Sequence, residues 1–469
     1  MTDSTTMTFG PIRPAERDVI LQALLAGVVP RTGLHLLQVG RDRELEALLQ
    51  DLDRIADGGS MMRFLVAAFG GGKTMMLKLM CSLANDRRMV STSADMTAQR
   101  RLSGGDGHAL RLYRQLTANL ATRAQPNGGA LDAIVERFVA ECVDAAERDG
   151  TDPEEVIRGR LAELAALPDG YDFRTVILAF WRGHDSGDNQ LRTDALRWLR
   201  GEFDTRTDAR QALGVRSIIN DDNMISSLKL LARLCRLAGY RGLLVCIDEL
   251  VALYRHASAH ALKANYEAIL NLINEAHDGT AVGLGFAFGV TPDALINPHR
   301  GLYSYAALYQ RLAENRFATP DYPDFTGPVM RLSNLRPEEL FELLRKLRHI
   351  VAAGDPARHS LDDDGLEAFM AHCSRQVGDR YVAAPRLVIK EFVGLLVTLD
   401  QHPDRDWNDL LPRIDIAEDR DPTSAPDPAA AAASRTDQHS GDTSASPSAN
   451  PLTIEPLNSS IGDLNSFEL

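Results

Sequence analysis

Short apolar runs alternate along this chain with longer segments in which apolar residues recur every three to four positions. Residues 61–68, 242–247 and 282–290 are almost continuously apolar, as is typical of strands covered on both faces. A further strand is expected at 89–94. The intervening segments have the spacing of amphipathic helices, for example from Leu45 to Ile55. Strands that alternate with helices in this way predict an α/β protein with a parallel sheet.

The helical segments also divide the chain into parts. Residues 105–235 carry helical patterns with few strand signals, so we interpret them as an insert into the α/β core. An insert of this length typically recognises a partner, which the sequence does not identify. After Pro320 the pattern is helical again and predicts a lid. The expected parts are a disordered N-terminus at 1–13, an α/β core at 14–320 that contains the insert, an all-helical lid at 321–414 and a disordered acidic tail at 415–469.

The tail is rich in Pro, Ala, Ser and Asp and includes five consecutive alanines at 429–433. Such a composition cannot bury enough apolar surface to offset the entropy lost on ordering, so we expect disorder. Apolar residues return between Leu452 and Leu469. They fit either a tethered docking peptide or an inert terminus.

Composition narrows the class of protein. Hydrophobic residues make up 44% and charged residues 25% of the chain, which is ordinary for a soluble globular protein. The net charge is −14, of which residues 415–469 carry −8, so the remainder is close to neutral and DNA is a possible partner without being indicated. The five cysteines are dispersed without a C-x-x-C pair, which favours a reducing cytoplasm over disulfides or a zinc site. There is no secretory h-region and no apolar run of about 18 residues, so we expect neither secretion nor a membrane span.

A glycine-rich turn follows the first expected strand. The window Ala67–Thr74 reads AAFGGGKT and matches the end of the phosphate-loop pattern G-x-x-x-x-G-K-[ST], with a strand before it and a helix after it. Glycines let successive backbone N–H groups turn inward, and the helix directs its positive end at the phosphates. The predicted cofactors are ATP and Mg²⁺, with Lys73 on the β- and γ-phosphates and the Thr74 hydroxyl on Mg²⁺. The glycines expected to hold the phosphates are Gly70, Gly71 and Gly72.

The first glycine of that pattern is replaced by Ala67. Alanine tolerates the required backbone less well if φ is positive there, and the neighbouring glycines can supply the flexibility instead. The simpler alternative is a glycine-rich turn beside a lone buried lysine.

An acidic pair ends the strand at 242–247. Asp248 follows this apolar run directly and can accept a hydrogen bond from Mg²⁺-bound water, while Glu249 can orient or deprotonate the attacking water. A strand-terminal acidic pair also occurs as a helix N-cap. Together with the phosphate loop, the pair favours hydrolysis over transfer of phosphate to a small molecule.

The order of these motifs resembles the AAA+ superfamily, in particular the branch of initiator ATPases and STAND-type switches. In that branch a V-G-R-x-x-E-L box precedes the phosphate loop and lines the adenine. Val39, Gly40 and Arg41 open such a box here, and the resemblance implies that they bind nucleotide. A helix N-terminus with exposed charges is the alternative.

The same resemblance implies two sensor residues. Thr291 ends the strand at 282–290 and would sense the γ-phosphate, although a threonine followed by proline also stops a strand without any such role. Arg386 follows Pro385 at the start of a lid helix and would reach the phosphates as a second sensor, unless it is a solvated first-turn arginine.

More narrowly, the chain resembles the BREX-associated ATP-binding protein (BrxD-like) family of bacterial phage-defence islands. The likeness rests on the combination VPRTGLHLLQVGRDRELEALLQDLDRIADGG, the phosphate loop soon after it, GLLVCIDELVALYR and LYSYAALYQRLAENRF, and it covers roughly residues 14–400. It implies ATP binding beside a methyltransferase or helicase partner that acts on phage DNA.

AAA+ assemblies often insert an arginine into the site of a neighbouring subunit. Arg311 is the preferred candidate and Arg316 the second, which would imply a homo-oligomer. A surface arginine without that task is the alternative for each.

The sequence therefore predicts a P-loop, AAA+-like ATPase with a helical insert and a helical lid, which acts as a nucleotide-driven switch or remodeller in a defence complex. One rival is a scaffold that holds ATP without turnover. Another is a P-loop kinase for a small metabolite, for which transfer to an added acceptor would be diagnostic.

Overall fold

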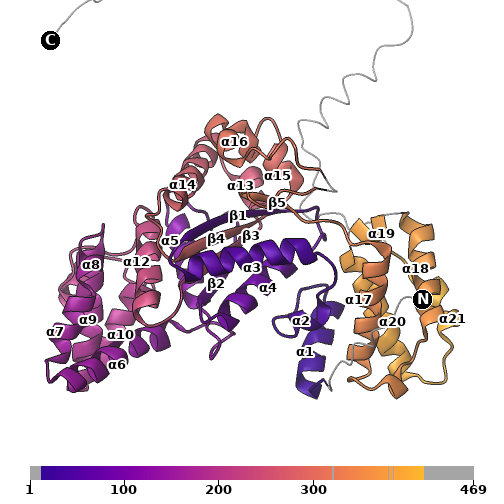
Figure 1. Ribbon diagram of the computed structural model, residues 1–469, viewed down its shortest axis with the longest axis horizontal. Coiled ribbons are helices and arrows are strands. Elements are labelled where there is room, and N and C mark those ends of the chain that lie inside the picture. The colour runs from indigo at the N-terminus through magenta and orange to yellow at the C-terminus, as the bar shows by residue number, and fades with distance from the viewer. Residues whose placement is uncertain (1–11, 320–321, 379, 384, 417–469) are drawn as a thin grey trace, which may run out of the picture. The chain divides into compact units, whose positions relative to one another are not determined.

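The computed structural model describes residues 12–319, 322–378, 380–383 and 385–416, and all of these belong to one compact unit (Figure 1). Nearly all of the stretches expected to be disordered, 1–13 and 415–469, lie outside the described residues, and so does the proposed docking peptide.

A five-stranded sheet forms the centre of the α/β part, with strand order β2-β3-β4-β1-β5. Every neighbouring pair is parallel, so the predicted α/β fold with a parallel sheet is confirmed. The strands are β1 (Ser60–Val66), β2 (Val90–Asp95), β3 (Leu243–Asp248), β4 (Leu284–Val290) and β5 (Val329–Arg331). β1, β3 and β4 coincide with the three apolar runs of the sequence, and β2 coincides with the further strand expected at 89–94. Sequence reasoning missed β5, which lies in a stretch expected to be wholly helical, because three residues give no periodic signal.

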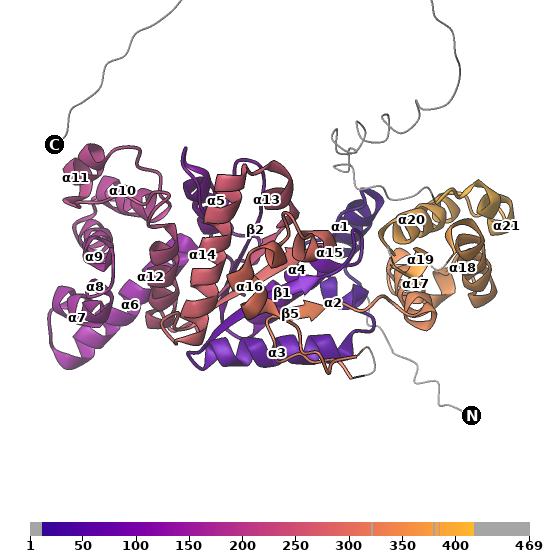
Figure 2. The same cartoon turned by 90° about the horizontal axis from the view of Figure 1, so that it is seen from above.

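Alternate strand residues face two different layers of helices. On one side Leu65 and Cys246 share a core with α3 (Asp42–Ala56) and α4 (Lys73–Asp86). On the other side Phe64 and Val245 share a core with α5 (His108–Ala118), α12 (Met224–Leu237) and α14 (Ala259–His277). Figure 2 shows α14 crossing the sheet beside β1. Strands buried on both faces explain the continuous apolar runs.

Helices α5 to α12 occupy the whole connection between β2 and β3, in the region expected to be an insert. Their largest buried side chains include Phe138, Phe173 and Trp198, which belong to the same hydrophobic cluster as one face of the sheet. Between α5 and α12 the chain forms α6 (Leu131–Asp149), α7 (Pro153–Arg160), α8 (Ala162–Ala165), α9 (Gly170–Ser186), α10 (Asn189–Leu199) and α11 (Arg206–Leu213).

A separate hydrophobic cluster joins the C-terminal helices to the first helix of the chain. Phe369 and Phe392 are fully buried there, with ring centroids 4.9 Å apart. The helices that build this cluster are α1 (Pro14–Leu25), α17 (Pro337–Val351), α18 (Asp363–Val377) and α20 (Pro385–Gln401). Thus α1 precedes the phosphate loop in sequence, yet its buried face packs with helices that follow β5.

The remaining helices are short. They are α2 (Leu34–Leu37), α13 (Val251–His256), α15 (Pro292–Ile296), α16 (Ala306–Leu312), α19 (Arg380–Ala383), α21 (Trp407–Leu410) and the 3-10 turns η1 (Leu302–Ser304), η2 (Pro356–Arg358) and η3 (Leu411–Arg413). No helix in the described ranges is long and apolar enough to cross a membrane.

A buried ion pair ties β1 to α3. Arg63 and Asp51 have side chains only 4% and 2% exposed, and the guanidinium contacts the carboxylate through Nη2 at 2.5 Å and Nε at 2.7 Å. Arg63 also donates to the carbonyls of Phe325 and Gly327 ahead of β5. This one arginine therefore holds three segments together.

Replacing Asp51 by alanine is expected to destabilise the protein by about 3–5 kcal/mol, because a buried guanidinium loses its counter-charge. The measurement is the shift of the urea unfolding curve. Arg54→Ala is the matched control: Arg54 is 61% exposed and lies 3.8 Å from the same carboxylate, so its loss should cost at most about 1 kcal/mol. Equal shifts for the two variants would contradict this account of the buried pair.

Candidate nucleotide-binding site

The glycine-rich turn lies between the end of β1 and the start of α4, as predicted. Gly70 and Gly72 have φ of 74° and 91°, in the left-handed region that favours glycine. Ala67 is not among the described residues that have a positive φ. Alanine at the first position of the pattern therefore brings no backbone strain. A Cβ on Gly71 would lie 3.1 Å from both the Ala67 Cβ and the Ala68 carbonyl oxygen. This close approach gives Gly71 a steric reason to be glycine.

Lys73 is the first residue of α4. Its ammonium group donates to the carbonyl oxygens of Ala67 and Ala68 at 3.0 and 2.9 Å, and so it lies against the loop. The free N–H groups at the start of a helix and a lysine beside them make a site for anions. The loop and Lys73 therefore have the charge and the geometry for a phosphate chain.

Asp248 and Thr74 meet at the carboxyl end of the sheet. The Thr74 hydroxyl donates to Asp248 Oδ2 at 2.5 Å, and Asp248 Oδ1 accepts the Glu249 N–H at 2.9 Å. Asp248 is buried, at 7% exposure. Mg²⁺ in nucleotide sites is usually held by one or two protein oxygens, with water and phosphate oxygens completing the shell. The residues present fit that donor set.

Sequence reasoning missed Gly289, which makes room for Asp248. The two residues lie side by side on β4 and β3, since Ile247 pairs with Phe288. A Cβ on Gly289 would lie 2.0 Å from Asp248 Oδ1. A glycine in a strand often marks such a close approach, but only the register of the sheet reveals what approaches it.

Glu249 is exposed and has φ of 56°, in the left-handed region. For a residue other than glycine this conformation costs on the order of 1–3 kcal/mol and is concentrated at functional sites. The strain lies one residue beyond the buried Asp248, where β3 ends. Five other described residues besides glycine also have a positive φ, so the catalytic role of Glu249 stays a prediction.

Asp95 adds another carboxylate at the same edge. It ends β2 and pairs in register with Asp248. Asp95 is exposed, yet desolvation by the surrounding protein, and next the charge of Asp248, raise its pKa, while Arg100 and Lys78 act in the opposite direction. Asp95 was not singled out in the sequence because only strand pairing places it beside Asp248.

The predicted V-G-R box contacts the phosphate loop and the segment after β5. Arg41 donates to the Gly71 carbonyl at 2.8 Å and to the Ser333 carbonyl at 2.9 Å. Burial lowers the pKa of its guanidinium. The Glu44 carboxylate accepts the N–H and the hydroxyl of Ser333. This box therefore links the loop to the connection that leads into α17.

The other two residues of the box lie close to C-terminal helices. Val39 packs against the cluster formed by α1, α17, α18 and α20. Gly40 has φ of 55°, and a Cβ on it would lie 2.4 Å from the Glu339 side chain. Contact of Val39, Gly40 and Arg41 with adenine stays a prediction.

Thr291 directly follows β4 and is the N-cap of α15, where its hydroxyl accepts the Ala294 N–H at 3.4 Å. Val290 pairs with Val66 of β1, so Thr291 lies at the edge that carries the phosphate loop. The capping role is observed, and the γ-phosphate sensor role stays a prediction.

The two predicted arginines lie in different places. Arg386, on α20, donates to the Gly27 carbonyl at 2.5 Å, and its guanidinium lies 5.5 Å from the ring centroid of Phe69 in the phosphate loop. Arg311, on α16, donates to Asn274 at 3.2 Å. Asn274 lies near the end of α14, where the Ala276 carbonyl accepts the hydroxyl of Ser60 at the start of β1. Arg311 therefore lies near the edge of the sheet where β1 begins, opposite to the edge that carries the phosphate loop of the same chain.

Among the residues that the structure describes, no group of three or more His, Cys, Asp or Glu side chains could hold a metal ion.

Arg316, the second finger candidate, has its guanidinium 4.9 Å from the ring centroid of Phe317, which is 74% exposed. These contacts assign it no role at the site.

Ligands of parallel α/β proteins bind at the carboxyl ends of the strands, and here that edge carries a strand–loop–helix unit of the kind that cradles nucleotide phosphates. The chain thus has a P-loop-like fold, which defines it as a nucleotide-binding protein. It belongs to the family of BREX system ATP-binding proteins BrxC/D, whose family model matches residues 12–415. The predicted resemblance to that phage-defence family is confirmed, and the description of the family as ATP-binding supports the prediction of ATP as the ligand. The comparison with curated proteins gives no match.

Proposed function

We propose that the chain hydrolyses ATP in the presence of Mg²⁺ and acts as an AAA+-like switch in a BREX complex. The observation that carries this proposal is the 2.5 Å hydrogen bond from Thr74 to the buried Asp248, with Glu249 as the next residue. A phosphate loop alone can serve binding. The combination with two successive carboxylates also supplies metal binding and a base.

Each residue has a defined task in this mechanism. The loop N–H groups and Lys73 hold the phosphate chain, and Thr74 and Asp248 would hold Mg²⁺. When bound, Mg²⁺ neutralises charge on the phosphate oxygens. Glu249 accepts a proton from a water molecule as its oxygen attacks the γ-phosphorus and the bond to the ADP oxygen breaks. The products are ADP and phosphate.

The contacts around the loop suggest how hydrolysis is converted into movement. Arg41 joins the loop to Ser333, and Arg386 contacts both Gly27 and the loop residue Phe69. A γ-phosphate would compete for Arg386, and Thr291 would report the same group from β4. ATP would thus draw α20 toward the loop and hydrolysis would release it.

Arg311 would act only on the site of a second copy, because it lies away from its own loop. This part of the proposal implies a homo-oligomer. A methyltransferase or helicase of the BREX system is the partner class that we propose for the assembled switch.

The test of hydrolysis is phosphate release from ATP by the full chain, first with Mg²⁺ and then after chelation with EDTA. We expect turnover that EDTA abolishes and that added Mg²⁺ restores, because the metal neutralises the charge that develops on the phosphates. Lys73→Ala should show no turnover under either condition.

The rivals predict other outcomes. Tight ATP binding without phosphate release under any condition, including added DNA, would support the scaffold. Phosphate that appears on an added small-molecule acceptor instead of in water would support the kinase.

A further inference from the structure

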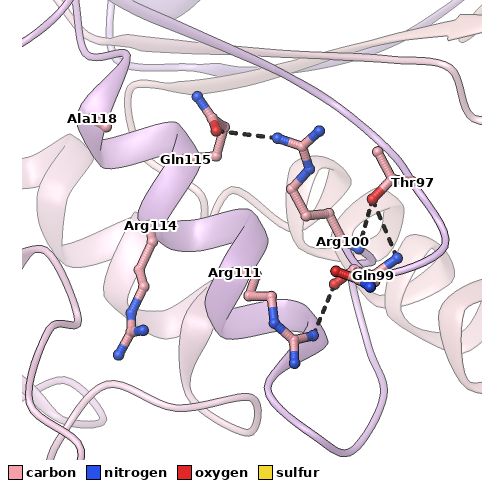
Figure 3. Close-up of a pocket in the computed structure, with 7 residues that line it drawn as sticks. All are labelled: Thr97, Gln99, Arg100, Arg111, Arg114, Gln115 and Ala118. Carbon is pink, nitrogen blue, oxygen red and sulfur yellow. Dashed lines mark hydrogen bonds between the residues drawn. The ribbon is translucent and has the colours of Figure 1, made fainter.

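A pocket lined by arginines lies just beyond the carboxyl end of β2 (Figure 3). Its volume is about 420 Å³, and its wall contains no carboxylate and no aromatic ring. Apart from Ala118, the lining residues are Thr97, Gln99, Arg100, Arg111, Arg114 and Gln115. None of them belongs to the phosphate loop or to the Asp248 site.

The local fold builds this pocket from two walls. On α5 the polar residues Arg111, Arg114 and Gln115 are three and four positions apart and so share one face, while Leu112 and Leu116 are fully buried on the other. The second wall is a turn in which Thr97 Oγ1 accepts the N–H groups of Gln99 and Arg100 at 3.2 and 3.1 Å. Both walls are therefore fixed by backbone structure.

Neutral acceptors orient two of the three guanidinium groups. Arg100 donates to Gln115 Oε1 at 3.1 Å, and Arg111 donates to the carbonyls of Gln99 and Asp106 at 3.2 and 2.6 Å. In the described part of the chain no ion pair to a carboxylate is found for Arg100 or Arg111. A guanidinium carries five N–H donors, so both keep donors for a ligand, and Arg100 does so while it attracts the Asp95 carboxylate.

Arg114 is held differently. It donates to the Gly201 carbonyl at 2.7 Å and pairs at 3.3 Å with Asp204, whose side chain is 87% exposed. An exposed pair of this kind contributes about 0–1 kcal/mol. Its charge is therefore available to an anion at little cost.

The chemistry of the wall selects the class of anion. Guanidinium forks match phosphate oxygens, and Gln and Thr side chains also contact phosphates and sugars. The wall has no aromatic ring for stacking a base, on which sequence-tolerant binding of single strands depends. Ala118 is the one apolar residue among those that line it, whereas a nucleobase slot is lined mostly by apolar and aromatic side chains. We infer that this pocket binds the phosphate backbone of duplex DNA without reading its sequence.

The position of the pocket gives this inference consequences for the nucleotide site. Asp95, at the end of β2, pairs in register with Asp248, and Arg100 follows five residues later and attracts the Asp95 carboxylate. A DNA phosphate bound to Arg100 would draw the positive charge of its guanidinium away from Asp95, and so away from the edge of the sheet where Asp248 lies. The binding itself does not depend on the proposed hydrolysis.

The test is fluorescence anisotropy of a labelled random-sequence duplex with the full chain, without nucleotide and over a range of KCl concentrations. Arg100→Ala and Arg111→Ala should each weaken binding about three- to tenfold and lower the slope of log K against log salt by about one, since each removes one phosphate contact. Arg148→Ala is the matched control, because Arg148 is an exposed arginine on α6 that lies beside Asp144 and Glu147.

Three results would overturn the inference. The first is no binding of duplex by the wild type at low salt. The second is binding that Arg100→Ala and Arg111→Ala leave at the level of Arg148→Ala. The third is tighter binding of the matching single strand, or of polyglutamate, with the same dependence on Arg100 and Arg111. Unchanged urea unfolding curves for the variants exclude a loss of fold as the cause.

Discussion

Replacing Gly289 by alanine is expected to lower the rate of ATP hydrolysis by about 100-fold, because misplacing a reactive group by about 1 Å can cost that much. The added Cβ would lie 2.0 Å from Asp248 Oδ1 and 3.2 Å from Leu77 Cδ1. Asp248 is buried and cannot turn into solvent. Moving the carboxylate would disturb the bond from the Glu249 N–H to Oδ1 and the 2.5 Å bond from Thr74 to Oδ2. The proposed Mg²⁺ site would then lose the Asp248 oxygen. Steady-state phosphate release at several Mg²⁺ concentrations measures the effect.

Gly285→Ala is the control for a general disturbance of β4. Gly285 lies four residues earlier on the same face of the strand, and a Cβ there would meet Ile55 Cδ1 at 2.2 Å. The tip of a flexible side chain can move, so this variant should lose some stability and keep its rate per folded molecule. Equal losses of rate in the two variants would show that β4, rather than the fit of Asp248, sets the activity.

The α/β fold and the core of the candidate nucleotide site could be predicted because their signals are local in sequence. Strands buried on both faces are read as continuous apolar runs, and the phosphate loop needs only Ala67–Thr74 in its strand–helix setting. The pair Asp248 and Glu249 stands at the end of such a run. β5 could not be predicted, since three residues between loops give no period to detect.

The other parts of the site depend on which strands become neighbours. Asp95 and Gly289 adjoin Asp248 only through the registers of β2 and β4 against β3. In the sequence Asp95 is an aspartate at the end of a strand and Gly289 is a glycine within one. Both features are common in proteins, so neither singles out a site. The contact of Arg41 with Ser333 joins residues 292 positions apart. Such long-range contacts follow from tertiary packing and have no local signature.

Replacing Glu249 by glutamine is expected to lower hydrolysis by about 10²–10⁴-fold, the usual contribution of a general base. ATP binding should be retained, because Lys73, Thr74 and Asp248 stay in place. The amide keeps the shape of the side chain but cannot take the proton from water. The strained backbone at Glu249, with φ of 56°, should be unaffected by this substitution.

Asp95→Asn tests whether Asp95 or Glu249 is the carboxylate that takes the proton from water. Asp95 lies beside Asp248 in the sheet, yet it is one strand farther from β4 than Asp248. We expect this variant to change the rate much less than Glu249→Gln. The reverse order of effects would assign the base to Asp95.

A single-turnover measurement with limiting ATP and excess protein in Mg²⁺ tests directly whether this site cleaves ATP by means of Glu249. The wild type is predicted to convert bound ATP to ADP and phosphate, while Glu249→Gln binds ATP with similar affinity and leaves it intact over the same period. Equal rates of cleavage in the two proteins, or intact ATP on both, would contradict the account.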